Sequence, residues 1–264
     1  MKLLDLSLPS PAENLALDEA LLDWCESGQG EETLRFWESP QVFVVVGYAN
    51  KVDLETNRAA CEAANVPILR RCSGGGTVVQ GPGCLNYNLV LNIEANPELQ
   101  TIPQTNNFVM ERQRKAMEGV MKGAMEYWSN GVLEKQNNST TPSLQHSAPP
   151  PPLVRGHTDL ALGNLKFSGN AQRRKRHFLV FHGTFLLNFD LPLISRLLRM
   201  PSKEPDYREN RSHEQFITNL QIPADQIKAA LRDIWSAREP LTQIPDYQTL
   251  VRERYSRPEW NLKF

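Results

Sequence analysis

Two short apolar runs around Gly163 and Asn164 make up the stretch HTDLALGNLKFS, residues 157–168. Each run has the length of a short strand, and glycine followed by asparagine is a suitable two-residue turn between paired strands. A tight hairpin pairs its strands antiparallel, which argues against a doubly wound parallel sheet. The stretch therefore predicts an α+β (mixed α/β) fold.

The sequence on either side supplies further elements of such a fold. The candidate strands are rich in β-branched and aromatic residues. They are Thr33–Trp37, Val42–Gly47, Val66–Arg70, Leu85–Asn92, His157–Leu162, Leu165–Ser168 and Phe178–Asn188. The candidate helices are Leu15–Cys25 with Asn14 as its N-cap, Asp53–Ala64, and the proline-free Phe108–Trp128, which could cover one face of a sheet.

The composition is that of a soluble globular protein, with 40% hydrophobic and 22% charged residues among 264. The formal net charge of -1 provides no global field that would attract nucleic acid or an anionic membrane. The apolar run at the N-terminus is too short for the h-region of a signal peptide, and no run of about 18 apolar residues could span a bilayer. Four cysteines form no CxxC pair and no disulfide framework. We expect a cytoplasmic protein that binds neither nucleic acid nor membrane.

A segment of low complexity interrupts the chain at Asn137–Pro152 and ends in four consecutive prolines. Such a segment cannot bury apolar surface and favours an extended conformation. It could link two domains, but the strongest motifs lie on both sides of it. We therefore interpret it as a loop insertion at about residues 137–153 within a single domain that spans residues 1–264.

A glycine cluster follows two arginines in the motif RRCSGGGTVV, residues 70–79. Glycines allow close approach of backbone N–H groups to a ligand, and arginines pair with phosphate or carboxylate oxygens. The motif thus suits an acyl-phosphate or nucleotide anion, although it is neither a Walker A loop nor a GxGxxG fingerprint. A glycine-rich hairpin with solvated arginines explains the same residues equally well.

A lysine and a histidine stand in two later strands. Lys166 is followed by the small or polar residues 168–171, as expected where a strand passes close to a ligand. His182 belongs to a His-Gly-Thr triplet inside an apolar strand. A lone strand lysine is usually solvated, and a strand histidine usually belongs to the core. His182 and His177 could share a metal, but no Cys, Asp or Glu completes such a site, so we expect no resident metal.

Taken together, these motifs resemble the lipoate-protein ligase A family of the biotin and lipoate protein ligase superfamily. The family pattern is roughly RRxSGGGxV, then Lys-x-Ser-Gly-x-Ala, then His-Gly-Thr, and all three occur here in that order. The resemblance runs from about Asn14 to Leu220. It departs from the family after Val79, where His-Asp is common and this chain has Gln80 and Gly81.

The resemblance implies a largely antiparallel mixed sheet flanked by helices, like the catalytic domain of biotin ligases and class II aminoacyl-tRNA synthetases. It implies that ATP with Mg²⁺ activates lipoate to lipoyl-adenylate. The lipoyl group then passes to a lysine of a carrier, the lipoyl domain of a 2-oxoacid dehydrogenase E2 or the glycine-cleavage H protein. Lys166 would be the catalytic residue that holds the carboxylate and the α-phosphate. The residues carried over as ligand contacts are Arg71, Ser73, Gly74, Gly75, Gly76, Thr77, Val78, Val79, Asn86, Lys166, Ser168, Gly169, Ala171, His182 and Gly183.

The resemblance also leaves alternative functions for a protein of this fold. Octanoyltransferases and lipoyl amidotransferases of the same fold need no ATP and use a cysteine thioester, placed shortly before the lysine hairpin or after the His-Gly strand. Neither place holds a cysteine here, which favours the ligase, although Cys72 is a candidate substitute. A non-catalytic lipoate-binding protein is a further alternative, against which the retained Lys166 argues.

Two further expectations concern partners. We expect no separate C-terminal accessory domain, and single-domain members of the family can need a separate accessory protein. The basic run Arg173–Arg176 follows the lysine motif. Such a run is usually a solvated face, and its alternative role is to attract an acidic carrier domain.

Overall fold

The computed structural model describes residues 1–135, 153–156, 158–202 and 204–264. Its strands are β1 (Lys2–Asp5), β2 (Thr33–Trp37), β3 (Phe43–Val46), β4 (Ile68–Arg70), β5 (Val78–Gln80), β6 (Cys84–Asn92), β7 (Leu153–Arg155), β8 (Asp159–Leu162), β9 (Leu165–Arg174), β10 (Phe178–Leu186) and β11 (Glu239–Pro240). Its helices are α1 (Pro11–Glu26), α2 (Val52–Glu55), α3 (Arg58–Ala63), α4 (Ile102–Lys135), α5 (Pro192–Leu197), α6 (His213–Phe216), α7 (Ala224–Ile234), α8 (Gln248–Leu250) and α9 (Pro258–Asn261). Short 3-10 turns η1 (Pro97–Leu99) and η2 (Asp206–Arg208) and a π-helical turn η3 (Val251–Tyr255) complete the described elements.

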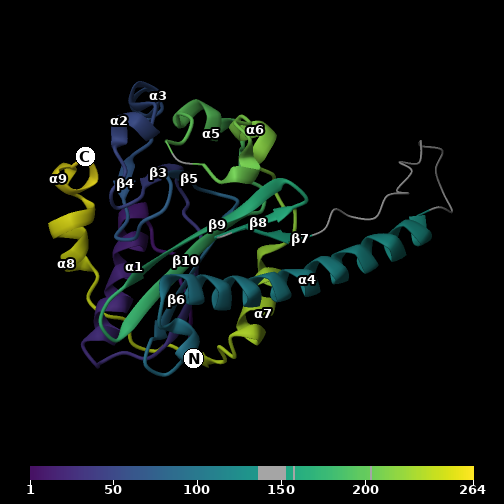
Figure 1. Cartoon of the computed structure of the whole chain (residues 1–264), viewed down its shortest axis with the longest axis horizontal. Coiled ribbons are helices and arrows are strands. Elements are labelled where there is room, and N and C mark those ends of the chain that lie inside the picture. The colour runs from purple at the N-terminus through teal and green to yellow at the C-terminus, as the bar shows by residue number, and fades with distance from the viewer. Residues whose placement is uncertain (136–152, 157, 203) are drawn as a thin grey trace.

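Two sheets organise the chain (Figure 1). The larger has eight strands in the order β11-β1-β2-β6-β10-β9-β8-β7, and the smaller has the order β4-β3-β5. In the larger sheet β1 pairs in parallel with β2 and β11, and the other described pairs are antiparallel. The predicted α+β fold with a largely antiparallel mixed sheet and flanking helices is confirmed.

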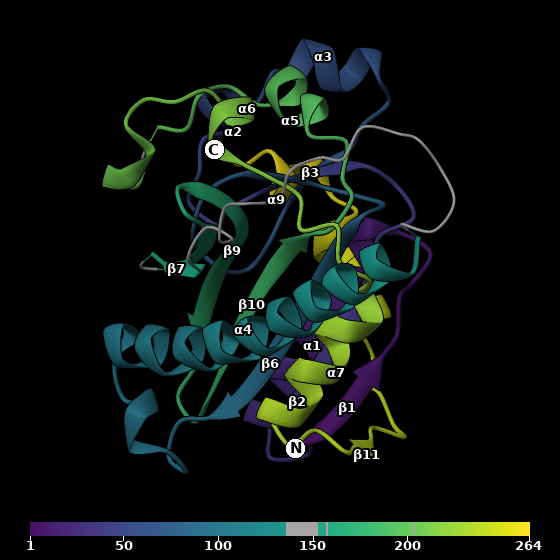
Figure 2. The same cartoon turned by 90° about the vertical axis from the view of Figure 1, so that its right-hand side faces the viewer.

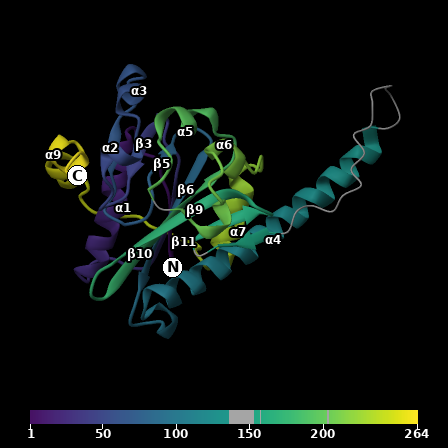
Figure 3. The same cartoon turned by 45° about the horizontal axis from the view of Figure 1, so that its top comes forward.

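Helices cover both faces of the large sheet. Helices α4 and α7 lie across one face (Figure 2), where Val109 and Leu231 share a core with Leu89 of β6. Helix α1 lies on the opposite face, where Leu21 packs against Val180 of β10. Figure 3 shows α4 reaching beyond the sheet, at the end of the molecule away from α9. Among the described residues, no helix combines the length and the apolar character needed to cross a membrane.

Helix α1 begins one turn earlier than the sequence predicted. Ser10 is its N-cap and forms a capping box with Glu13, while Pro11 occupies the first helical position. Asn14 was wrongly predicted as the cap. It is buried in the first turn, and its Nδ2 donates to the carbonyl oxygens of Leu8 and Ser10. Its amide therefore fixes the segment that enters the helix.

Several other boundaries differ from the predictions. The expected helix 53–64 is divided into α2 and α3, because the side chain of Asn57 accepts from the Ala60 amide and starts a new helix. Strand β9 continues six residues past Ser168, since its pairing with β10 extends to Arg174. The glycine-rich segment contains β5, which the sequence did not reveal.

Two predictions on organisation stay untested. The proline-rich insertion predicted at about 137–153 lies outside the described residues, except for Leu153 at the start of β7. The expectation of a single domain stays a prediction.

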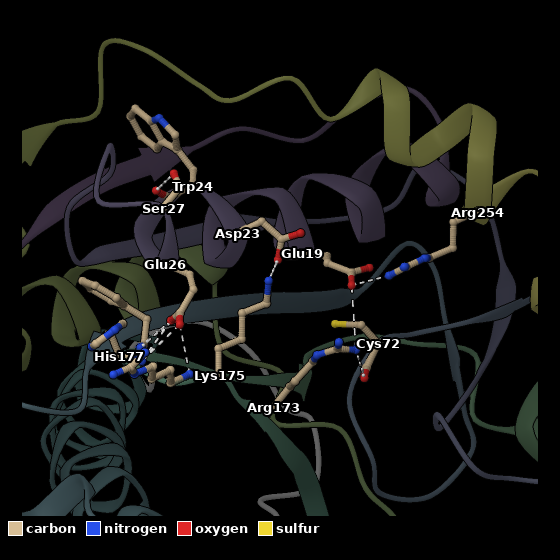
Figure 4. Close-up of polar contacts among 12 residues, drawn as sticks. Glu19, Asp23, Trp24, Glu26, Ser27, Cys72, Arg173, Lys175, His177 and Arg254 are labelled. Carbon is tan, nitrogen blue, oxygen red and sulfur yellow. Dashed lines mark hydrogen bonds and ion pairs between the residues drawn. The ribbon is translucent and has the colours of Figure 1, made fainter.

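Charged side chains of α1 hold the turn between β9 and β10 (Figure 4). The Glu26 carboxylate accepts from the backbone N–H groups of residues 176–178, and Asp23 pairs with Lys175 at 2.6 Å. Arg173 donates to the Cys72 carbonyl oxygen, and Arg174 to that of Leu99. Three of the four residues in the basic run thus have partners within the chain, which weakens their proposed role in attracting a carrier.

A buried ion pair joins α1 to β2. The NH1 group of Arg35 donates to Asp18 Oδ1 at 2.6 Å, and its NH2 group donates to Asn14 Oδ1 at 2.7 Å. The Trp37 indole donates to the second Asp18 oxygen. Both charged groups are buried, so each needs the other to offset the loss of hydration.

Replacing Arg35 by methionine leaves the Asp18 carboxylate buried without its counter-charge. We expect Arg35→Met to lower the free energy of unfolding by about 3–5 kcal/mol in urea denaturation. Arg58→Met is a matched control, because Arg58 pairs with Asp53 at the surface and its loss should cost less than about 1 kcal/mol. Equal costs for the two variants would contradict this role of Arg35.

Candidate active site

A cavity of about 470 Å³ lies between the large sheet, the small sheet and the segment that joins α5 to α6. Its size falls in the range of about 300–1,000 Å³ found for small-molecule sites. The predicted contact residues that line it are Arg71, Gly75, Gly76, Thr77, Val78, Val79, Asn86, Lys166, Ser168, Gly169, Ala171, His182 and Gly183. Ser73 and Gly74 do not line it.

Both arginines of the glycine motif are buried and hold loops in place. The Arg71 guanidinium donates to the carbonyl oxygens of Gly74 at 2.6 Å and Gly76 at 2.7 Å, and its Nε donates to Ser73 Oγ. Arg70 NH1 donates to three carbonyl oxygens in residues 47–50. The alternative of a hairpin with solvated arginines is therefore wrong.

The glycine loop is packed against a second loop. A Cβ atom on Gly47 would lie 2.1 Å from the Gly75 carbonyl oxygen, and Gly75 itself has a φ of +85°. Side chains are thus excluded at both positions, because the two backbones touch. Close packing and the hydrogen bonds of Arg71 hold the loop in this conformation, which favours preorganised binding.

Residues near the C-terminus hydrogen-bond to the backbone of Arg70 in the glycine motif, which was not predicted from the sequence. Asn261 Oδ1 accepts from the Arg70 backbone N–H at 3.0 Å, and the Trp260 indole donates to the Arg70 carbonyl oxygen at 2.8 Å. The buried Glu19 accepts from the Tyr255 hydroxyl at 2.8 Å and pairs with Arg254 (Figure 4). No local pattern reveals contacts between segments so far apart in the chain.

The Lys166 ammonium lies at the cavity and forms an ion pair. Its Nζ is 2.7 Å from Asp159 Oδ1, and the side chain keeps 25% of its surface exposed. A Cβ on Gly169 would lie 3.1 Å from Nζ, so glycine leaves room for the amine there. Asp159 was missed, because an irregularity between Leu160 and Ala161 shifts the register of the hairpin, so that Asp159 pairs with Gly169.

His182 faces the cavity as a neutral imidazole. Its Nε2 is 2.5 Å from Ser73 Oγ, so the ring nitrogen and the hydroxyl share a hydrogen bond. Burial, and then the charge of Arg71, lower the pKa of His182 to about 3. The Ser73 side chain is itself buried behind the cavity wall, so this pair offers no accessible nucleophile.

None of the four cysteines, all of which the structure describes, lines the cavity. Burial raises the thiol pKa of Cys25, Cys72 and Cys84 to about 12, and it also raises that of Cys61. The nucleophile in thioester formation is the thiolate, which such thiols do not populate near neutral pH. The position of Cys72 therefore gives no support to its role as a substitute nucleophile.

Further lining residues were not predicted from the sequence. Arg208 of η2 and His213, the first residue of α6, line the cavity, and neither belongs to a motif recognised in the sequence. Gln80, which stands where His is common in the family, donates to Thr184 Oγ1 at 2.7 Å, and Thr184 donates to Asn86 at 2.6 Å. This hydrogen-bonded row gives one wall of the cavity a polar surface.

The partly buried imidazole of His182 makes stability depend on pH. An unfolded histidine binds a proton below about pH 6.5, whereas His182 in the folded chain does so only near pH 3. The contribution of His182 is therefore fully present above pH 6.5 and is lost as the pH falls. We expect the loss of this contribution to lower the free energy of unfolding by about 1–2 kcal/mol when the pH falls from 7 to 5. Urea denaturation of His182→Gln should show a smaller loss than the native chain, and equal losses would contradict this account.

Comparison with known proteins gives a family match and relatives that cover nearly the whole chain. Residues 10–232 match the lipoyl protein ligase A/B catalytic domain family. Octanoyltransferase LipM of an Exiguobacterium species is 28% identical, over 95% of this chain and 94% of the relative.

Two solved structures share the fold. A bi-partite lipoate protein ligase of Thermoplasma acidophilum has a TM-score of 0.72 at 19% identity, covering 99% of this chain and 95% of that one. A lipoate-protein ligase A bound with ATP has a TM-score of 0.71 at 21% identity, covering 99% of this chain and 98% of that one. Since the family match spans most of the sequence, the chain belongs to the lipoyl protein ligase A/B catalytic domain family.

Proposed function

We propose that this protein transfers a medium-chain acyl group, lipoyl or octanoyl, to a lysine of a carrier protein. The observation that carries the proposal is the position of the Lys166 ammonium, which borders the same cavity as Gly75 and Gly76. Apolar side chains such as Val45 and Val79 line other parts of that cavity. An aliphatic acyl chain with an anionic head group fits this combination, and each buried methylene contributes about 0.8 kcal/mol.

The charge of Lys166 explains how the site would act. When an amine attacks an activated acyl group, negative charge grows on the carbonyl oxygen and on the leaving group. A positioned ammonium stabilises that charge more than it stabilises the bound substrate. His182 is neutral near pH 7, so it does not repel the carrier's lysine.

The first candidate donor is an acyl-adenylate made from the free acid and ATP. The absence of a cysteine from the cavity wall supports it, because this route needs no enzyme thioester. Lys166 and Arg208 give the wall two cations that match phosphate oxygens. Among the described residues, no cluster of acidic, histidine or cysteine side chains could hold a metal, so Mg²⁺ would arrive on the phosphates.

The second candidate is ATP-independent transfer from an octanoyl thioester of a carrier protein. Curated relatives are named Octanoyltransferase LipM, and this name supports the transferase route better than the ligase route. With no thiol in the cavity wall, the acyl group would pass straight from the donor thioester to the acceptor lysine. The acceptor would be a lipoyl domain or an H protein; a solved neighbour is described together with its E2 lipoyl domain.

Removing the ammonium tests the role of Lys166. We expect Lys166→Ala to lower turnover by roughly two to three orders of magnitude, about 3–4 kcal/mol, in an assay that follows the mass of an apo lipoyl domain. Lys166→Arg should restore little, because a planar fork replaces a point charge. Lys175→Ala is the control, since Lys175 pairs with Asp23 away from the cavity. Wild-type turnover in Lys166→Ala would refute the proposal.

A paired assay identifies the donor. One reaction contains octanoate or lipoate, ATP and Mg²⁺ with the apo lipoyl domain, and AMP release is followed; the other contains octanoyl carrier protein without ATP. We expect transfer with AMP release in the first. Transfer in the second alone would establish the octanoyltransferase. Tight acid binding without transfer in either would favour a binding protein or a missing accessory subunit.

The same assay tests the cysteines. In whichever reaction is active, we expect Cys72→Ala to keep the native turnover, because the buried Cys72 thiol does not line the cavity. Loss of activity in Cys72→Ala, together with an acyl-enzyme thioester trapped on the native chain, would show that the thiol is the nucleophile after all.

A further inference from the structure

Asp159 connects the proposed catalytic lysine to a distant segment. Its Oδ1 is 2.7 Å from Lys166 Nζ, and its Oδ2 accepts a hydrogen bond from the Tyr207 hydroxyl at 2.8 Å. Tyr207 lies in η2, within the segment that joins α5 to α6 and lines the cavity through Pro201 and Arg208. Three side chains from β9, β8 and η2 thus form one continuous chain of polar contacts.

The lysine needs such a restraint. Its four-carbon stem is flexible, and Gly169 beside the ammonium has no side chain that could limit its position. The Asp159 side chain keeps only 11% of its surface exposed, so solvent screens this ion pair less than it screens a pair at the surface. A single carboxylate contact therefore decides where the ammonium lies.

The carboxylate is fixed in turn by Tyr207. The tyrosine ring packs against Phe216 with the ring centroids 5.2 Å apart, and Arg211 donates to the Tyr207 carbonyl oxygen at 2.7 Å. A Cβ on Gly156 would lie 3.4 Å from the tyrosine ring, so the ring and the turn before β8 are in close contact. Burial and the charge of Asp159 raise the pKa of the Tyr207 phenol, so it remains a donor.

We infer that Asp159 and Tyr207 are positioning residues that hold the Lys166 ammonium where acyl transfer takes place. They also make its position depend on the segment between α5 and α6. This inference deepens the proposed function and rests on it for its catalytic part. The placement of the ammonium is a separate claim that can be measured without turnover.

The kinetic test uses Tyr207→Phe, which removes one hydroxyl and keeps the ring. The loss of one hydrogen bond to a charged group should lower kcat by about tenfold, with KM for the acid little changed. Tyr48→Phe is the matched control, because the Tyr48 hydroxyl makes no hydrogen bond to any described residue and the ring is exposed.

A double-mutant cycle separates positioning from general stability. If Tyr207 acts through Lys166, then Tyr207→Phe should change the residual rate of Lys166→Ala by less than about twofold. A tenfold effect that persists without the lysine would overturn the inference. Native kcat in Tyr207→Phe would do the same.

A second measurement is independent of activity. In a protein labelled with ¹⁵N at lysine Nζ, the ammonium signal of Lys166 is assigned by its loss in Lys166→Arg. We expect it to shift or broaden in Asp159→Asn and Tyr207→Phe and to be unchanged in Tyr48→Phe. A Lys166 signal that Tyr207→Phe leaves unchanged overturns the inference, even if the native chain is an active enzyme. An inactive native chain with the expected shifts would instead remove the proposed function and leave the positioning intact.

Discussion

The antiparallel register of β6, β10 and β9 decides which side chains meet in the cavity. Asn86, Thr184 and Gly169 are opposite one another, and the next row on the same face contains His182 and Ala171. Because side chains alternate between the faces of a strand, a slip by one residue would turn these groups toward the helical core. The apolar residues beneath α4 and α7 hold this register, so the core and the candidate site depend on the same pairing.

Two buried arginines then give the loops of the site their shape. Arg71 donates its hydrogen bonds to the glycine loop, and Arg70 donates to carbonyl oxygens of residues 47–50. The two arginines that suggested an anion site therefore mainly stabilise the loops around the cavity. Lys166 and Arg208 also line the cavity, and Asp159, the partner of Lys166, belongs to the same hairpin. The side chains that hold the glycine loop are thus different from the proposed catalytic cation, Lys166.

The placement of these charged residues and of the cysteines bears on whether the protein is a ligase or a transferase. The family's curated relatives are named as octanoyltransferases, yet the cysteines of this chain are buried away from the cavity. A route through an enzyme thioester requires an accessible thiolate, whereas direct attack on an activated donor requires a positioned cation. The arrangement of residues in the cavity is consistent with direct attack, whether the donor is an adenylate or a carrier thioester.

The sequence by itself determined the local features. Gly163 and Asn164 predicted the hairpin and with it the α+β class, and the order of three motifs predicted the family, because turns and motifs depend on neighbouring residues. Only the tertiary structure decided that Asn14 accepts from Arg35, that Asp159 joins Lys166 to Tyr207, and that residues near the C-terminus support Arg70. These contacts link residues far apart in the chain or depend on register, and strand pairing and core packing choose such partners where no local pattern specifies them.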